Sequence, residues 1–310
     1  MGDFVKYQAL GNDYLIVDPW RGGGALGTEP APGAVRLLCD RHCGVGADGL
    51  LFGPLEAPRP GTPAPLRIFN ADGSECGMSG NGLRMFALYL GEYYVHEWGT
   101  GTPFTVRTPG GDSEVRITDV TDGRVRVGMG RARFTTGTDT GTDVGGAAIT
   151  VVPLAGAGPD DEITVTDLRL GVPHTVVLTD AIDGELVQRL GPALARHSRH
   201  PEGTNVEFVR VRDDRTLDIA LWERAAGPVS ASGSGACAAA AVARARGLVG
   251  PDVTVRMPGG EVDVSVAPDG RINSTGTAQE VMAGVLSQSL LKQLAQHGTT
   301  LEEPSGRRGP

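Results

Sequence analysis

Two segments of the chain carry the same order of apolar and polar positions. Residues 65–70 (PLRIFN) and 217–224 (LDIALWER) alternate between apolar and polar side chains, which predicts a strand in each segment. In both copies a glycine-rich loop, an apolar run of helical length and a strand, turn and strand sequence follow. The chain therefore repeats one structural unit, and this repetition predicts two similar domains.

The predicted helix of each unit suits a buried position. In the first unit an apolar stripe recurs at helical spacing, at Leu83, Phe86, Ala87 and Leu90. We expect Gly91 to end this helix. In the second unit residues 236–245 are almost all small, which lets neighbouring backbone pack closely. Both helices are therefore expected to be central, each wrapped by a sheet.

The two hairpins that follow these helices share the letters TVRxPGG. They occupy residues 104–117 (FTVRTPGGDSEVRI) and 253–266 (VTVRMPGGEVDVSV), with a Pro-Gly-Gly turn in each. The repeat predicts an N-terminal domain, a C-terminal domain and a terminal segment of one short helix with a disordered tail. Their expected boundaries are 1–122 plus 273–285, 123–272 and 286–310, respectively.

Composition narrows the ligand and the compartment. Glycine supplies 47 of 310 residues, against a usual share of about 7%, which indicates many loops that a ligand can approach closely. A net charge of -9 without a basic run argues against nucleic acid. The four cysteines are too scattered for a disulfide framework, and no apolar run is long enough for a signal core or a membrane span. We expect a cytoplasmic protein with a small polar ligand, and no membrane partner.

Each glycine-rich loop carries a serine at the predicted start of its helix. The serines are Ser79 in MSGNG and Ser232 in SASGSGAC, and Asn70 and Glu223 end the strands before them. Helix N-termini present unpaired N–H groups and partial positive charge, which suit a carboxylate. If the two units face each other, both loops point into one cleft, a geometry that suits moving a proton between two faces of a carbon. Either serine alone would be an ordinary N-cap.

Seven blocks of the sequence, in order and over nearly the whole chain, resemble those of the diaminopimelate epimerase family. They are FVKYQALGNDYLIVD, CDRHCGVGADGLL, FNADGSECGMSGNGLRMFA, GVPHTVV, GTNVEFV, WERAAGPVSASGSGACAAAAVA and STGTAQEVMAG. The resemblance implies an α/β (α+β) fold of two pseudo-symmetric domains, each a curved, mostly antiparallel sheet around a central helix, with the active site between them. It also implies a place in amino-acid metabolism such as lysine biosynthesis, and an enzyme that uses no pyridoxal phosphate, no other cofactor and no metal.

The resemblance also implies roles for individual residues. The side chain of the substrate would be bound by Asn12, Asn70 and Asn205, and its distal amino-acid group by Glu223 and Arg224. The reacting carboxylate would be held by backbone N–H groups of Gly80, Asn81, Gly233 and Ser234. His174 would lie beside the catalytic pair.

The chain departs from the family pattern where the chemistry occurs. The family has a cysteine at each loop position, where this chain has Ser79 and Ser232, and the chain also has Val172 for an asparagine and Pro228 for an acid. A thiol with a pKa near ~8.5 becomes a usable base at a helix N-terminus. A serine hydroxyl does not, unless an adjacent base takes its proton. Two serines are therefore not expected to deprotonate a free amino acid.

These observations predict a cofactor-independent isomerase or epimerase that has diverged from diaminopimelate. It would transfer a proton at a carbon next to a carboxylate or carbonyl, on an amino-acid-like substrate whose proton is more acidic. The expected catalytic residues are Ser79, Ser232, His174 and Glu223, with His174 or Glu223 as the base and the serines as hydrogen-bond donors to the enolate. A homodimer is compatible with this assignment.

Two other functions remain open from the sequence. A lyase or cyclase of the same fold would use Ser and His in acid–base chemistry. A binding protein would keep the cleft without catalysis.

Other motifs carry less weight. GVGADG at 44–49 follows a helix-like segment and precedes a strand-like one, the wrong order for a dinucleotide loop. Cys39, His42 and Cys43 lack the second pair of ligands that a zinc site needs, so we expect buried cysteines there. Cys76 lies three residues before Ser79, and we interpret it as an ordinary loop cysteine.

Overall fold

The computed structural model describes residues 2–22, 26–27, 29–95, 101–136, 139–140, 148–154 and 162–298. Its helices are α1 (Pro32–Cys39), α2 (Gly80–Tyr93), α3 (Gly184–Ala195), α4 (Gly233–Ala245) and α5 (Gln288–Gly298). The remaining elements are strands, so the expected mixed α/β fold is confirmed. Among the described helices none is long and apolar enough to cross a bilayer.

A six-stranded sheet has the order β21-β1-β2-β3-β5-β6. Its strands are β1 (Phe4–Ala9), β2 (Asn12–Val17), β3 (Gly49–Phe52), β5 (Arg67–Asn70), β6 (Glu75–Cys76) and β21 (Gln279–Gly284). Only β2 and β3 pair in parallel. The predicted strand at PLRIFN is therefore β5, and it ends at Asn70 as expected.

The other strands form one long, mostly antiparallel path in the order β11-β10-β13-β14-β15-β16-β18-β19-β20-β9-β8-β7-β4, with β12 on β13 and β17 on β16. The strands up to residue 153 are β4 (Ala64–Pro65), β7 (Phe104–Thr108), β8 (Gly111–Asp119), β9 (Arg124–Arg131), β10 (Arg133–Thr136), β11 (Asp139–Thr140) and β12 (Thr150–Pro153). The later strands are β13 (Glu162–Leu170), β14 (Val172–Leu178), β15 (Asn205–Asp213), β16 (Thr216–Glu223), β17 (Gly227–Val229), β18 (Asp252–Met257), β19 (Gly260–Val266) and β20 (Arg271–Thr277).

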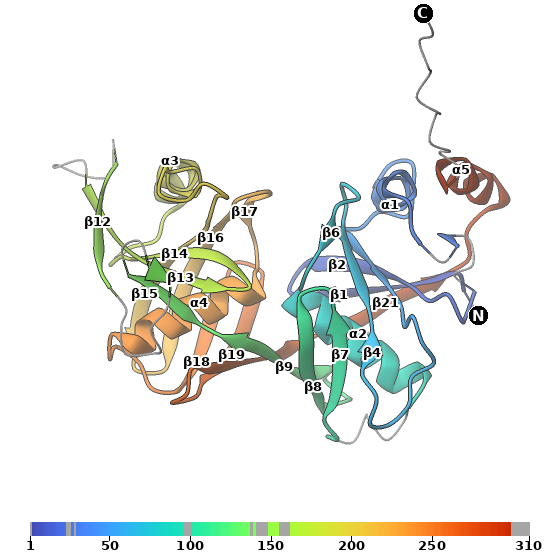
Figure 1. The fold of residues 1–310 in the computed structure, drawn as a ribbon, viewed down its shortest axis with the longest axis horizontal. Helices are drawn as coiled ribbons and strands as arrows, with labels where there is room; N and C mark the ends of the chain where they lie inside the picture. Colours follow the sequence, from blue (N-terminus) through green and yellow to red (C-terminus); the bar gives the residue numbers. More distant parts are fainter. Residues whose placement is uncertain are drawn as a thin grey trace, which may run out of the picture.

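Strands wrap around α2 in one half of the molecule and around α4 in the other (Figure 1). In α2 every residue from Gly80 to Gly91 is buried, and in α4 the run from Ala236 to Ala243 is at most 1% exposed. A helix that is apolar on all sides belongs in a core. The expected pair of central helices is therefore confirmed.

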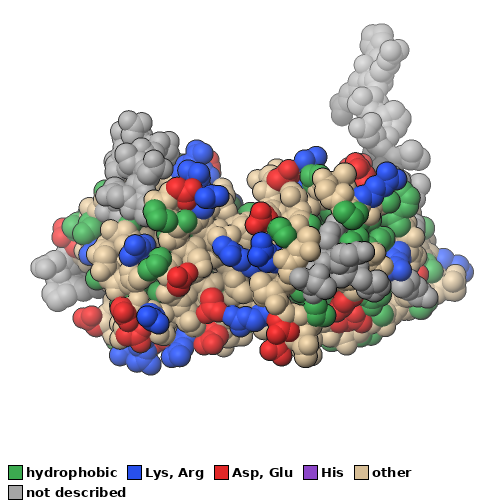
Figure 2. Space-filling view, turned by 90° about the horizontal axis from the view of Figure 1, so that it is seen from below, with side chains coloured by type: hydrophobic (Ala, Val, Ile, Leu, Met, Phe, Trp, Pro, Cys, Tyr) green, Lys and Arg blue, Asp and Glu red, His purple; other side chains and the backbone are tan. Residues whose placement is uncertain are grey.

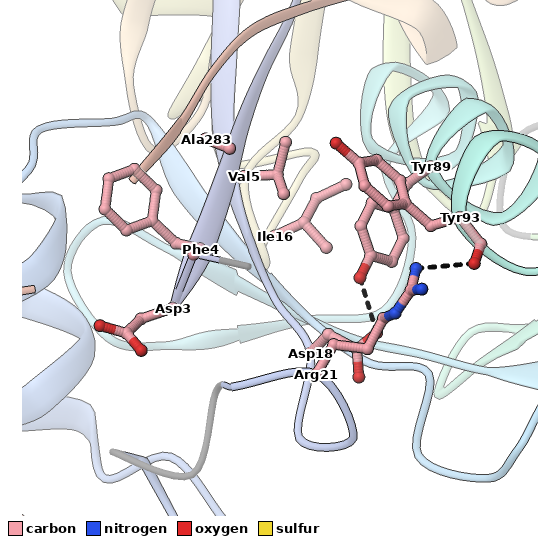
Figure 3. A pocket seen from close by; sticks show the side chains of 10 residues that line it. Asp3, Phe4, Val5, Ile16, Asp18, Arg21, Tyr89, Tyr93 and Ala283 are labelled. Atoms are coloured by element: carbon pink, nitrogen blue, oxygen red, sulfur yellow. Dashed lines mark hydrogen bonds between the residues drawn. The ribbon is translucent and has the colours of Figure 1, made fainter. Parts of the chain in front are cut away.

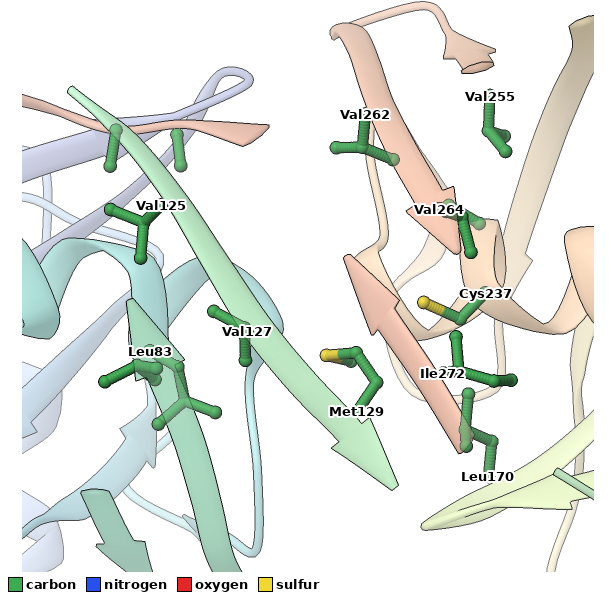
Figure 4. Packing of buried hydrophobic residues seen from close by; sticks show 14 of the residues in the cluster. Leu83, Val125, Val127, Met129, Leu170, Cys237, Val255, Val262, Val264 and Ile272 are labelled. Carbon is green, nitrogen blue, oxygen red and sulfur yellow. The ribbon is translucent and has the colours of Figure 1, made fainter. Parts of the chain in front are cut away.

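Two strands join the halves. The start of β9 packs on α2, where Val125 and Val127 face Leu83, and Met129 lies farther along the strand between the halves (Figure 4). Strand β20 pairs with β9 on one side and with β19 on the other, and it contacts both central helices. The two helices are thus held in one continuous framework.

Each half also has an outer helix. Helix α1 packs on β3 and on α5, and α3 packs on β15 and β16. The aliphatic side chains of these helices form separate clusters from the main core. In each half, part of a sheet therefore lies between the central helix and an outer helix (Figure 1).

The repeated hairpins form as predicted. They are β7–β8 and β18–β19, with Thr108 opposite Gly111 and Met257 opposite Gly260. Both glycines have φ in the left-handed region, +119° and +136°, which explains why the second glycine of each Pro-Gly-Gly turn is needed.

Two local predictions were wrong. Helix α2 continues through Gly91 to Tyr93, because Tyr89 and Tyr93 stack on each other and hold the last turn in place. Cys43 is exposed rather than buried, because it follows the end of α1 in an open turn, whereas Cys39 is buried in the helix. The short helix expected after residue 285 is α5, and the expected disordered tail falls largely on residues 299–310, outside the described residues.

Candidate active site

Ser79 and Ser232 are the N-caps of the two central helices. Ser79 Oγ accepts a hydrogen bond from the Gly82 N–H at 3.1 Å, and Ser232 Oγ accepts one from the Gly235 N–H at 3.4 Å. Both residues have the extended backbone of an N-cap. An oxygen that accepts these bonds still has its own proton to donate, so both serines can serve as hydrogen-bond donors.

The N-termini of α2 and α4 lie next to each other. A Cβ built on Gly233 would lie 3.5 Å from Gly80 Cα and 4.0 Å from the backbone N of Asn81. The positive ends of α2 and α4 therefore converge on one place, where an anion is favoured. The expectation that the two serine loops share one location agrees with this geometry.

A buried arginine adds positive charge behind the first loop. Arg84 is fully buried and donates hydrogen bonds to Oδ1 of Asn81 and, at 3.4 Å, to Oγ of Ser274. Burial lowers its pKa to about 10, so it stays charged at neutral pH. No carboxylate pairs with it in the described part of the chain. Arg84 was not among the residues expected at the site, although a charged residue inside an apolar helix is a signal visible in the sequence.

Asn12 and Asn81 are joined directly. The Asn81 side-chain amide donates to Oδ1 of Asn12 at 3.2 Å, and Asn12 donates to Oδ2 of Asp48 at 2.9 Å. The amide of Asn81 therefore links the start of α2 to the start of β2. Of the two, Asn81 is buried and Asn12 only partly so.

Tyr14 is a second residue that the sequence analysis missed. Its side chain is buried, and its hydroxyl is hydrogen-bonded to the Ser79 side chain. Burial raises the pKa of Tyr14 strongly, the bond to Ser79 opposes the rise, and the Glu223 carboxylate adds to it. The phenol therefore stays protonated and acts as a hydrogen-bond partner rather than a base.

Cys76 lies in the same loop but is not a thiolate. Its Sγ is 3.1 Å from the Met78 carbonyl oxygen, to which it donates. Burial raises the pKa of Cys76, and the Glu223 carboxylate raises it further. A neutral thiol of this kind is a poor base at neutral pH, which favours the interpretation of Cys76 as an ordinary loop cysteine.

His174 forms a buried pair with Glu207 in the other half. The Nδ1 of His174 on β14 lies 2.7 Å from Oε1 of Glu207 on β15, and both side chains are at most 1% exposed. The two strands run in parallel, with Asn205 opposite His174. Glu207 was not among the expected site residues, although a charged residue within the apolar segment NVEFV is a signal visible in the sequence.

The residues at the end of β16 contact the start of β15. The Arg224 backbone N–H donates to Oδ1 of Asn205 at 3.1 Å, and the Arg224 side chain donates to the Glu202 carbonyl oxygen at 3.1 Å. Asn205 is buried, Glu223 is half-buried and Arg224 is exposed. The Glu223 carboxylate raises the pKa of both Tyr14 and Glu207, so it lies in the neighbourhood of both residues.

Not every candidate is tied to this cluster. Asn70 is exposed, and its side chain donates to Ser74 Oγ at 2.9 Å within its own loop. Ser234, by contrast, stays with the cluster, because its Oγ lies 3.5 Å from Ser232 Oγ in the first turn of α4. Val172 begins β14 opposite Leu170, and Pro228 is exposed in β17 opposite Trp222.

The small cavity in Figure 3 lies elsewhere. It has a volume of about 30 Å³ and is lined by residues of β1, β2 and the C-terminal end of α2, among them Tyr89 and Tyr93. Tyr89 donates to Asp18 at 2.6 Å, and Arg21 donates to the Tyr93 carbonyl oxygen at 2.6 Å. This volume fits water rather than an amino acid, and the serine loop is at the opposite end of α2.

The charge distribution agrees with a small ligand. Acidic and basic side chains are interspersed over the face in Figure 2, and ion pairs such as Arg131–Asp269 (3.3 Å) lie on the surface. No group of three or more His, Cys, Asp and Glu side chains suited to a metal ion occurs within the described ranges.

Comparisons with known proteins identify the family. The family model described as diaminopimelate epimerase matches residues 4–135 and 168–281. Diaminopimelate epimerase 2 from a Nostoc species is 36% identical over 291 residues, covering 93% of this chain and 96% of that protein.

Solved structures show the same fold. A probable proline racemase from Agrobacterium radiobacter has a TM-score of 0.65 at 19% identity, covering 92% of each chain. A hydroxyproline epimerase from Agrobacterium vitis, with bound trans-4-hydroxy-L-proline, has a TM-score of 0.65 at 17% identity, covering 90% of each chain. The chain belongs to the diaminopimelate epimerase family and is a cofactor-independent isomerase.

Proposed function

We propose that this isomerase moves a proton at a carbon next to a carboxylate or carbonyl of a small, amino-acid-like substrate. The observation that carries the proposal is the meeting of two serine-capped helix N-termini, where a Cβ built on Gly233 would lie 3.5 Å from Gly80 Cα. Two sets of N–H groups and the buried Arg84 favour a carboxylate there. A carboxylate held at this point places the neighbouring carbon between the two halves.

The base in this proposal is His174, with Glu223 as the other candidate. An imidazole can accept a proton near neutral pH, whereas a serine hydroxyl cannot without help. Ser79 and Ser232 donate hydrogen bonds to the enolate that forms when the carbon loses its proton. Because no thiolate takes part, the substrate is one whose proton is more acidic than that of diaminopimelate.

Substrate binding follows the same assignment. The reacting carboxylate is bound by backbone N–H groups of Gly80, Asn81, Gly233 and Ser234, and the rest of the substrate contacts Asn12, Asn70, Asn205 and Arg224. The partly buried link between Asn81 and Asn12 (3.2 Å) supports a shared binding surface. We also propose a homodimer and a cytoplasmic location.

Deuterium exchange tests the function. We would incubate the protein in heavy water with diaminopimelate, proline, trans-4-hydroxy-L-proline and carboxylates with more acidic α-protons, and follow each compound by mass spectrometry and NMR. Deuterium incorporation without a change of formula is expected for at least one compound. Loss of water or ring closure would instead indicate a lyase or cyclase, and tight binding without exchange would indicate a binding protein.

Two variants test the assignment of the base. His174→Ala should lower the exchange rate by about 100-fold or more, because it removes the general base. Ser79→Ala should lower the rate less, because one donor is lost and the helix cap costs only about 1 kcal/mol of stability. Circular dichroism and thermal melting would check folding. Equal and small losses in both variants would show that the base is elsewhere.

A further inference from the structure

Glu207 and His174 form a pair whose outer atoms have no protein partner. Their inner atoms, Oε1 and Nδ1, are 2.7 Å apart. The remaining atoms, Oε2 of Glu207 and Nε2 of His174, are buried without a hydrogen-bond partner among the described residues. Leaving a buried polar atom unpaired destabilises the folded protein, so each such atom calls for an explanation, of which a catalytic role is one.

The pair lies beside the second serine loop. A Cβ built on Gly235 would be 3.1 Å from Oε1 of Glu207 and 3.3 Å from Cβ of Ser232. Glu207 therefore packs against the first turn of α4, at the end whose N-cap is Ser232. A side chain larger than hydrogen at position 235 would meet both Glu207 and Leu221, which lies 2.6 Å from the same Cβ.

The environment of Glu207 and His174 determines which of their atoms are protonated. Burial raises the pKa of Glu207 above its ordinary value, and the charge of His174 and the hydrogen bond between the two residues oppose this rise. The positive end of α4 also favours the carboxylate. With Glu207 ionised, the proton between the two residues belongs to Nδ1, so a neutral His174 has an unprotonated Nε2.

We propose that Glu207 is a positioning residue that holds His174 in the tautomer able to accept a proton at Nε2. The inference rests on the proposed function, in which His174 is the base. When Nε2 takes the proton from the substrate carbon, the electron pair of the broken C–H bond stays on the substrate as the enolate. The Nδ1 proton remains on His174, and the Glu207 carboxylate stabilises the imidazolium. This arrangement supplies the activated base that the missing thiols would otherwise have provided.

The tautomer can be measured without a substrate. In protein labelled with ¹⁵N-histidine, the imidazole nitrogen shifts of His174, assigned with His174→Gln, should show Nδ1 protonated and Nε2 unprotonated in the neutral form. In Glu207→Gln this preference should be lost, because an amide can present either an oxygen or an NH₂ group to Nδ1. Glu207→Asp should retain part of it. Nε2 protonation in the neutral form of the unaltered protein would overturn the proposal.

Kinetics give the second readout. With the substrate identified by deuterium exchange, Glu207→Gln should lower kcat at least tenfold and leave KM within about threefold, since the wrong tautomer cannot accept the proton. Glu207→Asp should recover part of kcat. Glu261→Gln, an exposed carboxylate on β19, is the matched control and should keep the full rate.

The outcomes separate this inference from the function on which it rests. If His174→Ala keeps the exchange rate, the assignment of the base fails and the inference fails with it. If His174→Ala loses the rate while Glu207→Gln keeps both the rate and the tautomer, only the role of Glu207 is wrong.

Discussion

Tyr14 interacts with Ser79, and removing this interaction is the most direct test of the role of the first serine loop. Ser79 Oγ accepts the Gly82 N–H at 3.1 Å, and its second lone pair can accept the proton of the Tyr14 hydroxyl. Burial keeps the Tyr14 phenol protonated, so it has this proton to donate. The two hydroxyls thus form a short chain of donors that runs from Tyr14 to Ser79 and leaves the Ser79 proton for the enolate.

We predict that Tyr14→Phe lowers the deuterium exchange rate about tenfold, which corresponds to the loss of one useful hydrogen bond. In a Ser79→Ala background the same change should cost much less, since the chain of donors is already broken. A double-mutant cycle on the exchange rate measures this coupling. Fully additive losses would mean that the two hydroxyls act separately.

At the scale of single residues, the sequence predicted where a residue lies in its helix or strand better than it predicted which side chains that residue contacts. The serines could be placed at helix starts because each lies in a glycine-rich loop, a glycine follows it directly and an apolar run comes next. Tyr14 and Glu207 could not be assigned in the same way, because the role of each depends on a contact with a residue that is distant in the sequence. Tyr14 meets Ser79, and Glu207 meets His174, only after the strands have paired.

Among the elements, the β1–β2 hairpin is held to the loop before β3 by the carboxylate of Asp13. Asp13 forms ion pairs with Lys6 at 2.8 Å and with Arg41 at 2.7 Å, and it accepts the Asp48 N–H at 3.1 Å. Burial favours its neutral form, but Arg41 and Lys6 outweigh this and lower the pKa of Asp13 to about 2. The loop carries Asp48, which in turn holds Asn12 of the candidate site.

This shift predicts how stability depends on pH. A carboxyl whose pKa falls from about 3.9 in the unfolded chain to about 2 in the folded protein stabilises the fold above pH 4, and the contribution is lost between pH 4 and pH 2. Asp13→Asn should therefore lower the free energy of unfolding by about 1 kcal/mol at pH 7, because solvent screens the exposed Arg41. The difference from the unaltered protein should vanish near pH 2.

Urea denaturation at a series of pH values measures this difference. Asp112→Asn is the control, because Asp112 pairs with Arg107 on the surface at 2.8 Å and should not change stability measurably. A difference for Asp13→Asn that stays constant from pH 7 to pH 2 would contradict the prediction.

Whole elements were the part of the fold that the sequence predicted most reliably. The hairpins formed where Pro-Gly-Gly turns require a left-handed glycine, and α4 formed where almost all residues from 236 to 245 are small enough for close packing. The end of α2 was not predictable from Gly91, because Tyr89 and Tyr93 stack and Tyr93 bonds to Glu280 of a distant strand. Tertiary contacts therefore overrode a local stop signal.

At the scale of the molecule, the two halves are joined through β9 and β20. The boundaries at 122/123 and 272/273 remain predictions; the first falls just before β9, and the second falls inside β20. Because β20 contacts both central helices, a shift of one half relative to the other would also move the two helix N-termini. The geometry of the site is therefore a property of both halves together, which a single sequence motif cannot specify.

The six-stranded sheet ends at β21, and this edge is where we expect a second copy to bind. Strand β21 pairs with β1, and Val281 and Met282 on it are 54% and 46% exposed, with Val285 beyond its end 76% exposed. An open edge with exposed apolar side chains favours pairing with another chain. Antiparallel pairing of β21 with its own copy has the twofold symmetry of a closed dimer.

We predict that the protein sediments as a dimer of its 32.2 kDa chain at micromolar concentrations, and that Met282→Lys raises the dissociation constant at least tenfold. The lysine would bring two like charges together across the twofold axis and would leave them poorly solvated. Val120→Lys is the matched control, because Val120 is 51% exposed but lies between β8 and β9, away from this edge. Sedimentation velocity over a concentration series distinguishes the two variants. A monomer in the unaltered protein, or equal weakening by both substitutions, would show that the β21 edge is not the interface.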